Sequence, residues 1–417
     1  MSPVTMPIFE DLPREPDALV ERLFAEDRPA GDLVRLYHQL RTLAPVHQSG
    51  IERLGRPWIV TRHADAAWVA REKSLIKDER LVDQLGGDPN SLFVQTMKRM
   101  MNFIPAPRHT RLRHLVNSGF TKGTVERLRP GVKAHVESLI EARRPDRRMD
   151  LVRDFAYPIP LAMICELIGV PLEDTGAIEA WSREVIESVD EGRAVTPALE
   201  ERRNRAMKGF SDYFQALIDE RRARRRDDLV SRLVEVQQSA EDLSDEDIIA
   251  TCILLFQAGH DTTASLIAKG MLALLRHPDQ LAKLRARPEL IENATEELLR
   301  FDTSVQLSIN YAVADIAYHD RTIREGEPVI ILRGAANRDP ERFPDPDRLD
   351  IERKDIEHHS FGLGPHFCLG ASLARLEIQE AIGALVAGLP EMQVDLDSVV
   401  YRPSLHLHGL ESMPVHW

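Results

Sequence analysis

The sequence is poor in cysteine, with only three in 417 residues. Cys165, Cys252 and Cys368 provide no multi-bridge disulfide framework, and their spacing does not match a zinc site. Cys165 and Cys252 each lie in an apolar stretch with helical periodicity, so we expect both to be buried as small hydrophobic residues. We expect a cytoplasmic location, because thiols persist in a reducing compartment.

The sequence also lacks a long apolar run near its start. Its first residues, MSPVTMPIFEDLPREPDALVERLF, contain no stretch long enough to span a membrane. They also lack the charged start and apolar middle of a signal peptide. We therefore expect no membrane anchor.

The sequence contains fewer basic residues than acidic ones. The formal net charge is −13 at pH 7, which argues against nucleic acid as a partner. A basic run at Arg221–Arg226 is followed at once by Asp227 and Asp228. We interpret this run as the solvated end of an amphipathic helix.

The most informative stretch is Phe361–Gly370, which reads FGLGPHFCLG. Its glycines permit backbone angles that other residues resist, so the chain can pass close to a flat ligand. Helical periodicity from Ala371 onward predicts a helix directly after Cys368. The unpaired N–H groups and the dipole at the start of a helix favour a thiolate over a thiol. A thiolate presented in this way can bind a metal ion from one side.

This stretch resembles the heme-ligand loop of the cytochrome P450 family, usually written FGxGxHxCxG, and it matches every fixed position. The resemblance implies that Cys368 is the metal ligand, bound to the iron of one heme b (iron protoporphyrin IX). The remaining cofactor-binding residues that it implies in the loop are Phe361, Gly362, His366 and Gly370.

A long apolar helix is predicted between Ser244 and His277. Ser244 and Asp247 have the spacing of a capping box, and Pro278 ends the helical pattern. At 1.5 Å per residue, such a helix is about 50 Å long. Its middle is polar and contains a glycine, which costs about 1 kcal/mol inside a helix. The cluster is compatible with a kink around a buried water and with a groove that holds a ligand.

The cluster reads AGHDTT and resembles the family's AGxDTT oxygen-binding motif, which makes O2 a co-substrate. The resemblance implies two catalytic residues, Thr262 as a hydrogen-bond donor to the bound oxygen and Asp261 as a carrier of protons from solvent. Ala258 and Gly259 would keep the space over the heme iron clear.

The resemblance also indicates residues for the two heme propionates. The string HTRLR contains His109 and Arg113, which are four residues apart and therefore share a helix face, and it resembles the family's propionate-binding helix. His366 would join them. The chain departs from the family at Asn310, where many members have an arginine, and asparagine brings no charge. We hypothesise that Arg333 compensates.

A structural pair is expected at Glu297 and Arg300, which resemble the family's ExxR motif. An isolated pair three residues apart on a helix contributes little. In the family this pair locks the core behind the heme together with a further arginine. The string AANRDPERF resembles the companion stretch, so we expect Arg338 or Arg342 to be the third member.

The motifs occur in the family's order and imply a cytochrome P450 fold, mainly α-helical with small β-sheets. We expect a single large domain over residues 1–417 that encloses one heme. Helix-rich segments are expected at about 100–300 and 360–390, and β-rich segments near 45–65, 305–335 and 390–417.

The implied activity is that of a heme-thiolate monooxygenase, which inserts one oxygen atom from O2 into an apolar organic substrate by hydroxylation or epoxidation. Tailoring of a polyketide or terpenoid secondary metabolite is our working hypothesis. A peroxygenase that uses hydrogen peroxide and a non-enzymatic heme-thiolate sensor or carrier are the alternatives. The sequence contains no flavin or iron–sulfur motif, so electrons would come from a separate ferredoxin or flavodoxin with its reductase. We expect this partner to bind near Arg108, Arg111 and His114 of a monomer.

Apolar residues at four places in the sequence are expected to line the substrate pocket. The C-terminal stretch alternates like a strand or hairpin, and His406 and His408 lie in it at strand spacing. We assign them no metal, because no cysteine or carboxylate lies nearby. The expected pocket residues are Phe93, Met97, Met100, Phe103, Leu254, Leu255, Val305, Leu307, Leu405 and Leu407.

Overall fold

The computed structural model describes residues 8–25, 27–29, 31–188, 195–239 and 243–417. The beginning of the stretch considered for a signal peptide, residues 1–7, therefore lies outside the described residues. The chain divides into two compact units. The first consists of Met1–Ile76, Arg129–Ile159 and Thr262–Trp417, and the second consists of Lys77–Leu128 and Pro160–Asp261. The expectation of a single domain over residues 1–417 stays a prediction.

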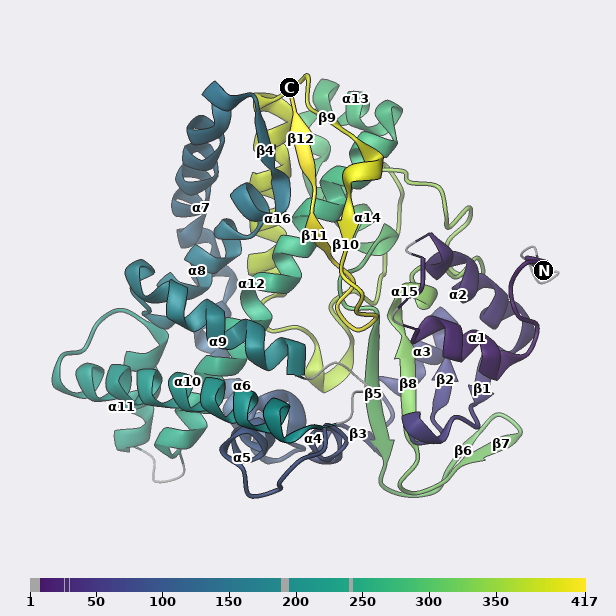
Figure 1. The fold of residues 1–417 in the computed structure, drawn as a ribbon, viewed down its shortest axis with the longest axis horizontal. Helices are drawn as coiled ribbons and strands as arrows, with labels where there is room; N and C mark the ends of the chain where they lie inside the picture. The colour runs from purple at the N-terminus through teal and green to yellow at the C-terminus, as the bar shows by residue number, and fades with distance from the viewer. Residues whose placement is uncertain (1–7, 26, 30, 189–194, 240–242) are drawn as a thin grey trace. The chain divides into compact units, whose positions relative to one another are not determined.

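The first unit is built on a five-stranded sheet with the strand order β1-β2-β8-β5-β3 (Figure 1). Strands β2 and β8 are parallel, and the other neighbours are antiparallel. Their β-branched and aromatic residues favour extended backbone. The strands are β1 (Val46–Gln48), β2 (Trp58–Val60), β3 (Leu75–Ile76), β5 (Leu307–Ala312) and β8 (Pro328–Leu332).

Successive side chains of this sheet alternate between two apolar clusters. On one face, Ile59 and Ile330 pack in a cluster with the leucines of α1 (Pro16–Leu23) and α2 (Asp32–Leu43). On the other face, Trp58 and Val329 pack in a cluster with residues of α3 (His63–Val69). The sheet is therefore covered on both faces.

Smaller sheets complete the β structure of the first unit. β4 (Arg148–Asp150), β12 (Pro414–His416) and β9 (Gln393–Val394) form one sheet in that order. β10 (Val400–Tyr401) pairs with β11 (Leu410–Ser412), and β6 (Ile316–Tyr318) pairs with β7 (Arg321–Ile323). The C-terminal stretch thus contains strands, as predicted, but β11 and β12 pair with other segments and not with each other.

Helices make up most of the remaining structure (Figure 1). The first unit also contains α13 (Pro278–Ala286), α14 (Ile291–Phe301), α15 (Arg333–Ala336) and α16 (Ala371–Gly388). The second unit contains α4 (Arg80–Asp83), α5 (Leu92–Arg99), α6 (Arg108–Asn117), α9 (Thr175–Ser188), α10 (Pro197–Ala223) and α11 (Leu229–Ser239). Three helices have residues in both units: α7 (Lys122–Arg143), α8 (Pro158–Ile168) and α12 (Asp245–Arg276).

Helix α12 begins with the predicted capping box. The Asp247 N–H donates to Ser244 Oγ at 3.2 Å, and the Ser244 N–H donates to Asp247 Oδ2 at 3.4 Å. The helix is α-helical from Asp245 to Arg276, through the polar cluster at 258–263. The polar residues are therefore presented on regular helical backbone.

Among the described helices, none is by itself both long enough and apolar enough to cross a membrane. The segments Val152–Ile168 and Leu172–Ile186 meet both conditions only together, with a bend of 119° between them.

Candidate functional site

The loop that carries Cys368 is a series of tight turns in the first unit. The short 3₁₀ helix Gly364–His366 precedes Cys368, and α16 begins three residues after it. The Cys368 N–H donates to the Phe361 carbonyl at 2.8 Å, which closes the loop on itself. Cys368 is exposed, whereas Cys165 and Cys252 are buried as predicted. The position of Cys368 in a glycine-containing loop directly before a helix is the arrangement that the sequence predicts.

Two glycines give this loop its shape. Gly362 and Gly364 have φ values of +70° and +69°, in the left-handed region that other residues rarely adopt. A Cβ atom on Gly364 would lie 2.2 Å from the Ala70 carbonyl oxygen, so this position also has no room for a side chain. The loop therefore requires glycine, which has no side chain, at Gly364, and its backbone conformation favours glycine at Gly362.

A charged and aromatic cluster supports the loop from behind. The Arg375 guanidinium lies 4.5 Å from the centre of the Phe361 ring and donates two hydrogen bonds to Glu296, at 2.6 and 2.9 Å. His358 Nε2 lies 3.3 Å from Glu296 Oε2, and the His358 and Phe361 rings are 5.9 Å apart. Hydrogen bonds from Arg375 and His358 hold the pKa of Glu296 at about 2, against its burial. Nothing in the sequence around Glu296 indicates this cluster, because its members come from three separate segments.

Asn310 stands at the position where many family members have an arginine, and its side-chain amide forms a hydrogen bond within the fold. Asn310 is buried, and its Nδ2 donates to the Leu75 carbonyl at 3.3 Å. Arg333 does not continue strand β8, because the strand ends at Leu332 and Arg333 is the first residue of α15. Its guanidinium lies against Gly362 of the loop.

One face in the middle of helix α12 is accessible to solvent. Leu254, Ala258 and Thr262 follow one another at a spacing of four residues, which places them on one face. All three are at least partly exposed, whereas Leu255 and Asp261 are buried. The face that contains Leu254, Ala258 and Thr262 is therefore accessible to a ligand.

The glycine of this helix has a packing role. A Cβ atom on Gly259 would lie 2.8 Å from Cγ1 and 2.9 Å from Cδ1 of Ile164 in α8. Gly259 thus leaves room for a neighbouring helix, and its role over a heme iron stays a prediction. At Thr262 the backbone carbonyl accepts a hydrogen bond from Ser304 Oγ at 2.8 Å.

Helix α6 of the second unit brings His109 and Arg113 onto one face, as predicted. His109 is buried, and burial together with the Arg113 and Lys77 charges lowers its pKa. In the predicted partner surface on this helix, Arg108 is exposed and also pairs with Asp247. Arg111 and His114 are exposed.

The buried pair of the ExxR motif is present, with a different third member. Arg300 Nε and Nη2 donate to the Glu297 carboxylate at 2.7 and 2.9 Å, and both side chains are fully buried. The third member is Arg353, whose Nε donates to Glu297 Oε1 at 3.1 Å. The stretch from Arg338 to Arg353 contains four arginines. Arg353, in the string DIER, is the last of them.

The expected third members, Arg338 and Arg342, bind elsewhere. Arg338 donates to the Phe301 carbonyl and to Asp347, and Arg342 pairs with Asp355. The prediction is corrected to Arg353, which reaches Glu297 because the chain turns back between Asp345 and Asp350.

The predicted pocket residues fall into different surroundings. In the first unit, Val305 and Leu407 form an isolated antiparallel bridge and are partly exposed, whereas Leu307 and Leu405 lie in the apolar cluster with α1 and α2. The latter two are therefore core residues, which apolarity alone could not reveal.

The second unit contains the remaining aromatic and methionine residues. Phe93 is fully buried beneath the Arg203 guanidinium, 4.5 Å from its ring centre, so it packs α5 against α10. Met97 and Met100 are buried, and Phe103 is partly exposed.

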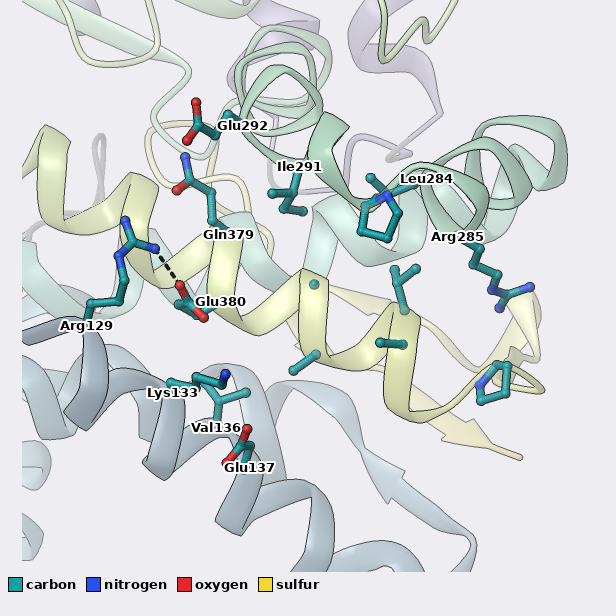
Figure 2. A pocket seen from close by; sticks show the side chains of 16 residues that line it. Arg129, Lys133, Val136, Glu137, Leu284, Arg285, Ile291, Glu292, Gln379 and Glu380 are labelled. Carbon is teal, nitrogen blue, oxygen red and sulfur yellow. Dashed lines mark hydrogen bonds and ion pairs between the residues drawn. The ribbon is translucent and has the colours of Figure 1, made fainter. Parts of the chain in front are cut away.

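A separate groove of about 640 Å³ lies in the first unit among α7, α13, α14 and α16. Figure 2 shows Arg129 of α7 joined to Glu380 of α16 at one end, with Leu284 and Arg285 of α13 toward the other. None of the residues predicted for heme or substrate lines it.

The C-terminal histidines do not form a metal pair with a third ligand. Within the described ranges, no group of three His, Cys, Asp or Glu side chains could hold a metal ion. His408 is buried and stacks on Tyr401, with a ring separation of 5.4 Å, and burial lowers its pKa to about 4.

Comparison with known proteins extends these local likenesses to the chain as a whole. The family model described as Cytochrome P450 matches residues 88–388. Vitamin D(3) 25-hydroxylase of Pseudonocardia autotrophica is 40% identical over 383 residues, which cover 91% of this chain and 92% of the relative. Polyketide biosynthesis cytochrome P450 PksS of Bacillus subtilis (strain 168) is 35% identical over 386 residues, with coverage of 90% and 94%.

A solved structure has the same fold. P450BioI in complex with hexadec-9Z-enoic acid ligated acyl carrier protein has a TM-score of 0.86 and 34% identity, and covers 93% of this chain and 98% of its own. The residues present here fit a heme-thiolate cofactor, because one loop contains an exposed thiol and two left-handed glycines, and the guanidinium of Arg333 lies against it. With the loop, the buried Glu–Arg pair and both comparisons in agreement, this chain belongs to the cytochrome P450 family of monooxygenases.

Proposed function

We propose that this protein is a heme b-dependent monooxygenase that inserts one oxygen atom of O2 into a C–H or C=C bond of an apolar organic substrate. The observation that carries the proposal is the loop of Cys368. In this loop an exposed thiol precedes a helix, and two glycines leave the backbone without side chains. When bound, the heme supplies the oxygen chemistry, and a thiolate ligand favours O–O cleavage.

The residues of the chain hold the cofactor and manage protons. Cys368 would bind the heme iron through its thiolate, and Phe361, Gly362 and Gly370 would shape the loop around it. His109, Arg113 and His366 are the proposed propionate partners, and a charged partner suits a carboxylate. On α12, Ala258 and Gly259 leave space, Thr262 holds the oxygen substrate by a hydrogen bond and Asp261 delivers protons.

The proposed substrate is an extended apolar molecule of secondary metabolism, such as a polyketide or terpenoid. Two relatives support an apolar substrate by name, since one is a vitamin D(3) hydroxylase and the other a polyketide biosynthesis enzyme. Leu254, with Val305 and Leu407, offers partly exposed apolar side chains to such a molecule. An acyl chain carried on an acyl carrier protein is a further form of substrate to test, because one structural neighbour was solved with that ligand.

A separate ferredoxin or flavodoxin, with its reductase, is the proposed electron donor. Arg108, Arg111 and His114 are all exposed on α6 and form the proposed docking surface, and Arg108 also pairs with Asp247. We propose a monomer in the cytoplasm, where the thiols of the chain would persist.

Turnover of candidate substrates with a surrogate ferredoxin system tests the function. We expect a ligand-induced shift of the heme spin state and product that contains one atom of labelled O2. Product formed only from hydrogen peroxide would instead indicate a peroxygenase. A ligand that shifts the spectrum but is consumed by neither route would indicate a sensor or carrier.

A further inference from the structure

Arg333 packs flat against the heme-ligand loop. A Cβ atom on Gly362 would lie 3.1 Å from Arg333 Nη2, 3.5 Å from Cζ and 3.7 Å from Nη1. Because three guanidinium atoms are nearly equidistant from one point, the planar group lies over the loop rather than pointing at it. Gly362 provides the room, and its φ of +70° independently favours glycine at this position.

The guanidinium of Arg333 has no hydrogen bond and no ion pair with any described residue. The buried arginines of the same unit behave differently. Arg41 donates to the Ala335 carbonyl, Arg300 to Glu297 and Arg338 to Asp347. A largely buried cation without an anion is costly, so a fold that retains one has a use for its charge.

Among the residues that the structure describes, no carboxylate forms an ion pair with Arg333. Burial lowers its pKa to about 10, and the only group that raises the pKa is Cys368. Arg333 therefore remains a cation at neutral pH. Burial, and after it the charges of His63 and Arg333, lower the pKa of His359 to about 3, so this histidine is neutral at pH 7.

We propose that Arg333 binds a propionate carboxylate of the heme, and that the chain has moved this cation from strand β5 to the start of α15. The inference rests on the proposed function, since it requires the heme. A guanidinium presents paired donors that match a carboxylate, whereas a thiolate offers one acceptor atom, and no hydrogen bond joins Arg333 to Cys368. Asn310, at the position of the family arginine, already donates to Leu75.

The test compares Arg333→Gln with Arg53→Gln in the full-length holoprotein. Arg53 is exposed and has no hydrogen bond or ion pair among the described residues, so it controls for the loss of one positive charge. We expect Arg333→Gln to transfer heme to apomyoglobin roughly 10-fold faster or more, the effect of losing a charged hydrogen bond. The propionate bending band in the resonance Raman spectrum should shift, and the reduced CO complex should keep the spectrum of a thiolate-ligated heme.

Two further variants guard against a folding defect. Arg333→Lys keeps the charge without the paired donors, and we expect it to lose heme at an intermediate rate. Adding Asn310→Arg to Arg333→Gln should slow heme loss again, because it returns a cation to strand β5. The inference is overturned if Arg333→Gln retains heme as well as Arg53→Gln does. It is also overturned if its CO complex converts to the thiol-ligated form, which would assign Arg333 to the thiolate. A wild-type protein without thiolate-ligated heme would overturn the proposed function as well.

Discussion

Thr262 and Thr263 are neighbours on α12 with different surroundings. Thr262 is partly exposed and lies on the stripe with Leu254 and Ala258, whereas Thr263 is buried one helical step away. We therefore propose that an oxygen substrate on this stripe accepts a hydrogen bond from Thr262 and not from Thr263.

We expect Thr262→Ala to lower the ratio of product formed to oxygen consumed by about 10-fold or more, since a positioned donor typically contributes at least that much. Simultaneous assay of oxygen uptake and product measures the ratio. Thr263→Ala is the matched control and should keep the wild-type ratio. Equal losses in both variants would remove Thr262 from the proposed mechanism.

Glu377 of α16 shows what an unpaired acid costs. Its side chain is buried, and neither carboxyl oxygen has a hydrogen-bond partner among the described residues. Burial raises its pKa well above the usual value. The native state therefore holds a proton that the unfolded chain releases above a pH of about 4.3.

We expect the free energy of unfolding to fall as the pH rises above about 4.3, by up to about 1.4 kcal/mol per pH unit until the native carboxyl ionises. Glu377→Met removes this proton and the unpaired oxygens, so its unfolding free energy should depend less on pH. At pH 7 it should exceed the wild-type value by about 1 to 3 kcal/mol. Urea denaturation at several pH values measures both. Parallel pH curves for the two proteins would contradict the assignment.

At the scale of the element, α12 is positioned by close packing at its glycine. A Cβ atom on Gly259 would meet the Ile164 side chain. Alanine gains about 1 kcal/mol of helix propensity over glycine, and overpacking costs about 1 to 3 kcal/mol. The balance depends on whether Ile164 can move.

We therefore expect Gly259→Ala to destabilise the protein, and Ile164→Val to reduce that loss because it removes the Cδ1 atom near the new methyl group. A double-mutant cycle in urea should give a coupling free energy of about 0.5 kcal/mol or more. Independent effects of the two substitutions would show that the helices separate without strain.

The stretch after strand β8 provides hydrogen-bond donors to the buried carboxylate of Glu297 in α14. Glu297 is fully buried and accepts hydrogen bonds from Arg300, from Arg353 and from the Asp350 N–H at 3.0 Å. Arg342 pairs with an exposed aspartate at the surface.

We expect Arg353→Leu to lower the free energy of unfolding by about 3 kcal/mol, because a partner is removed from a buried charge. Arg342→Leu should lower it by less than about 1 kcal/mol, because exposed pairs contribute little. Urea titrations of the two variants give the comparison. A larger loss for Arg342→Leu would restore the sequence-based choice.

Sequence alone could identify what depends on short spacing. The helix after Cys368, the capping box of α12 and the shared face of His109 and Arg113 all follow from neighbours within about four residues. The choice among four arginines does not, because a turn between Asp345 and Asp350 decides which one reaches Glu297. Likewise Leu307 and Val305 are both apolar, and only the packing of α1 and α2 makes the first a core residue.

At the scale of the whole molecule, distant segments share small sheets. Strand β12 joins β4 and β9, and the Leu151 N–H donates to the Met413 carbonyl at 2.9 Å. The Met413 N–H donates to Asp150 Oδ1 at 3.2 Å, and the Met413 side chain is fully buried. No local pattern predicts these pairings, because each joins residues that are far apart in the chain.

We expect Met413→Ala to lower the free energy of unfolding by about 2 to 5 kcal/mol, the range for truncating a buried methionine. Hydrogen exchange should speed up together at 148–151 and at 413–416, since the two segments share hydrogen bonds. Glu411→Ala, an exposed change in the neighbouring strand, is the control and should alter neither. Faster exchange at only one of the segments would show that they open separately.

The exposed stripe of α12 bears on how such an enzyme changes over generations. Leu254 lies on the face that we propose to bind substrate, and its neighbour Leu255 is buried. Replacing a partly exposed leucine loses less burial free energy than replacing a buried one. Natural mutation and laboratory selection can therefore change the substrate through Leu254 with little loss of folding stability. Leu255 and Gly259 stay constrained by their neighbours.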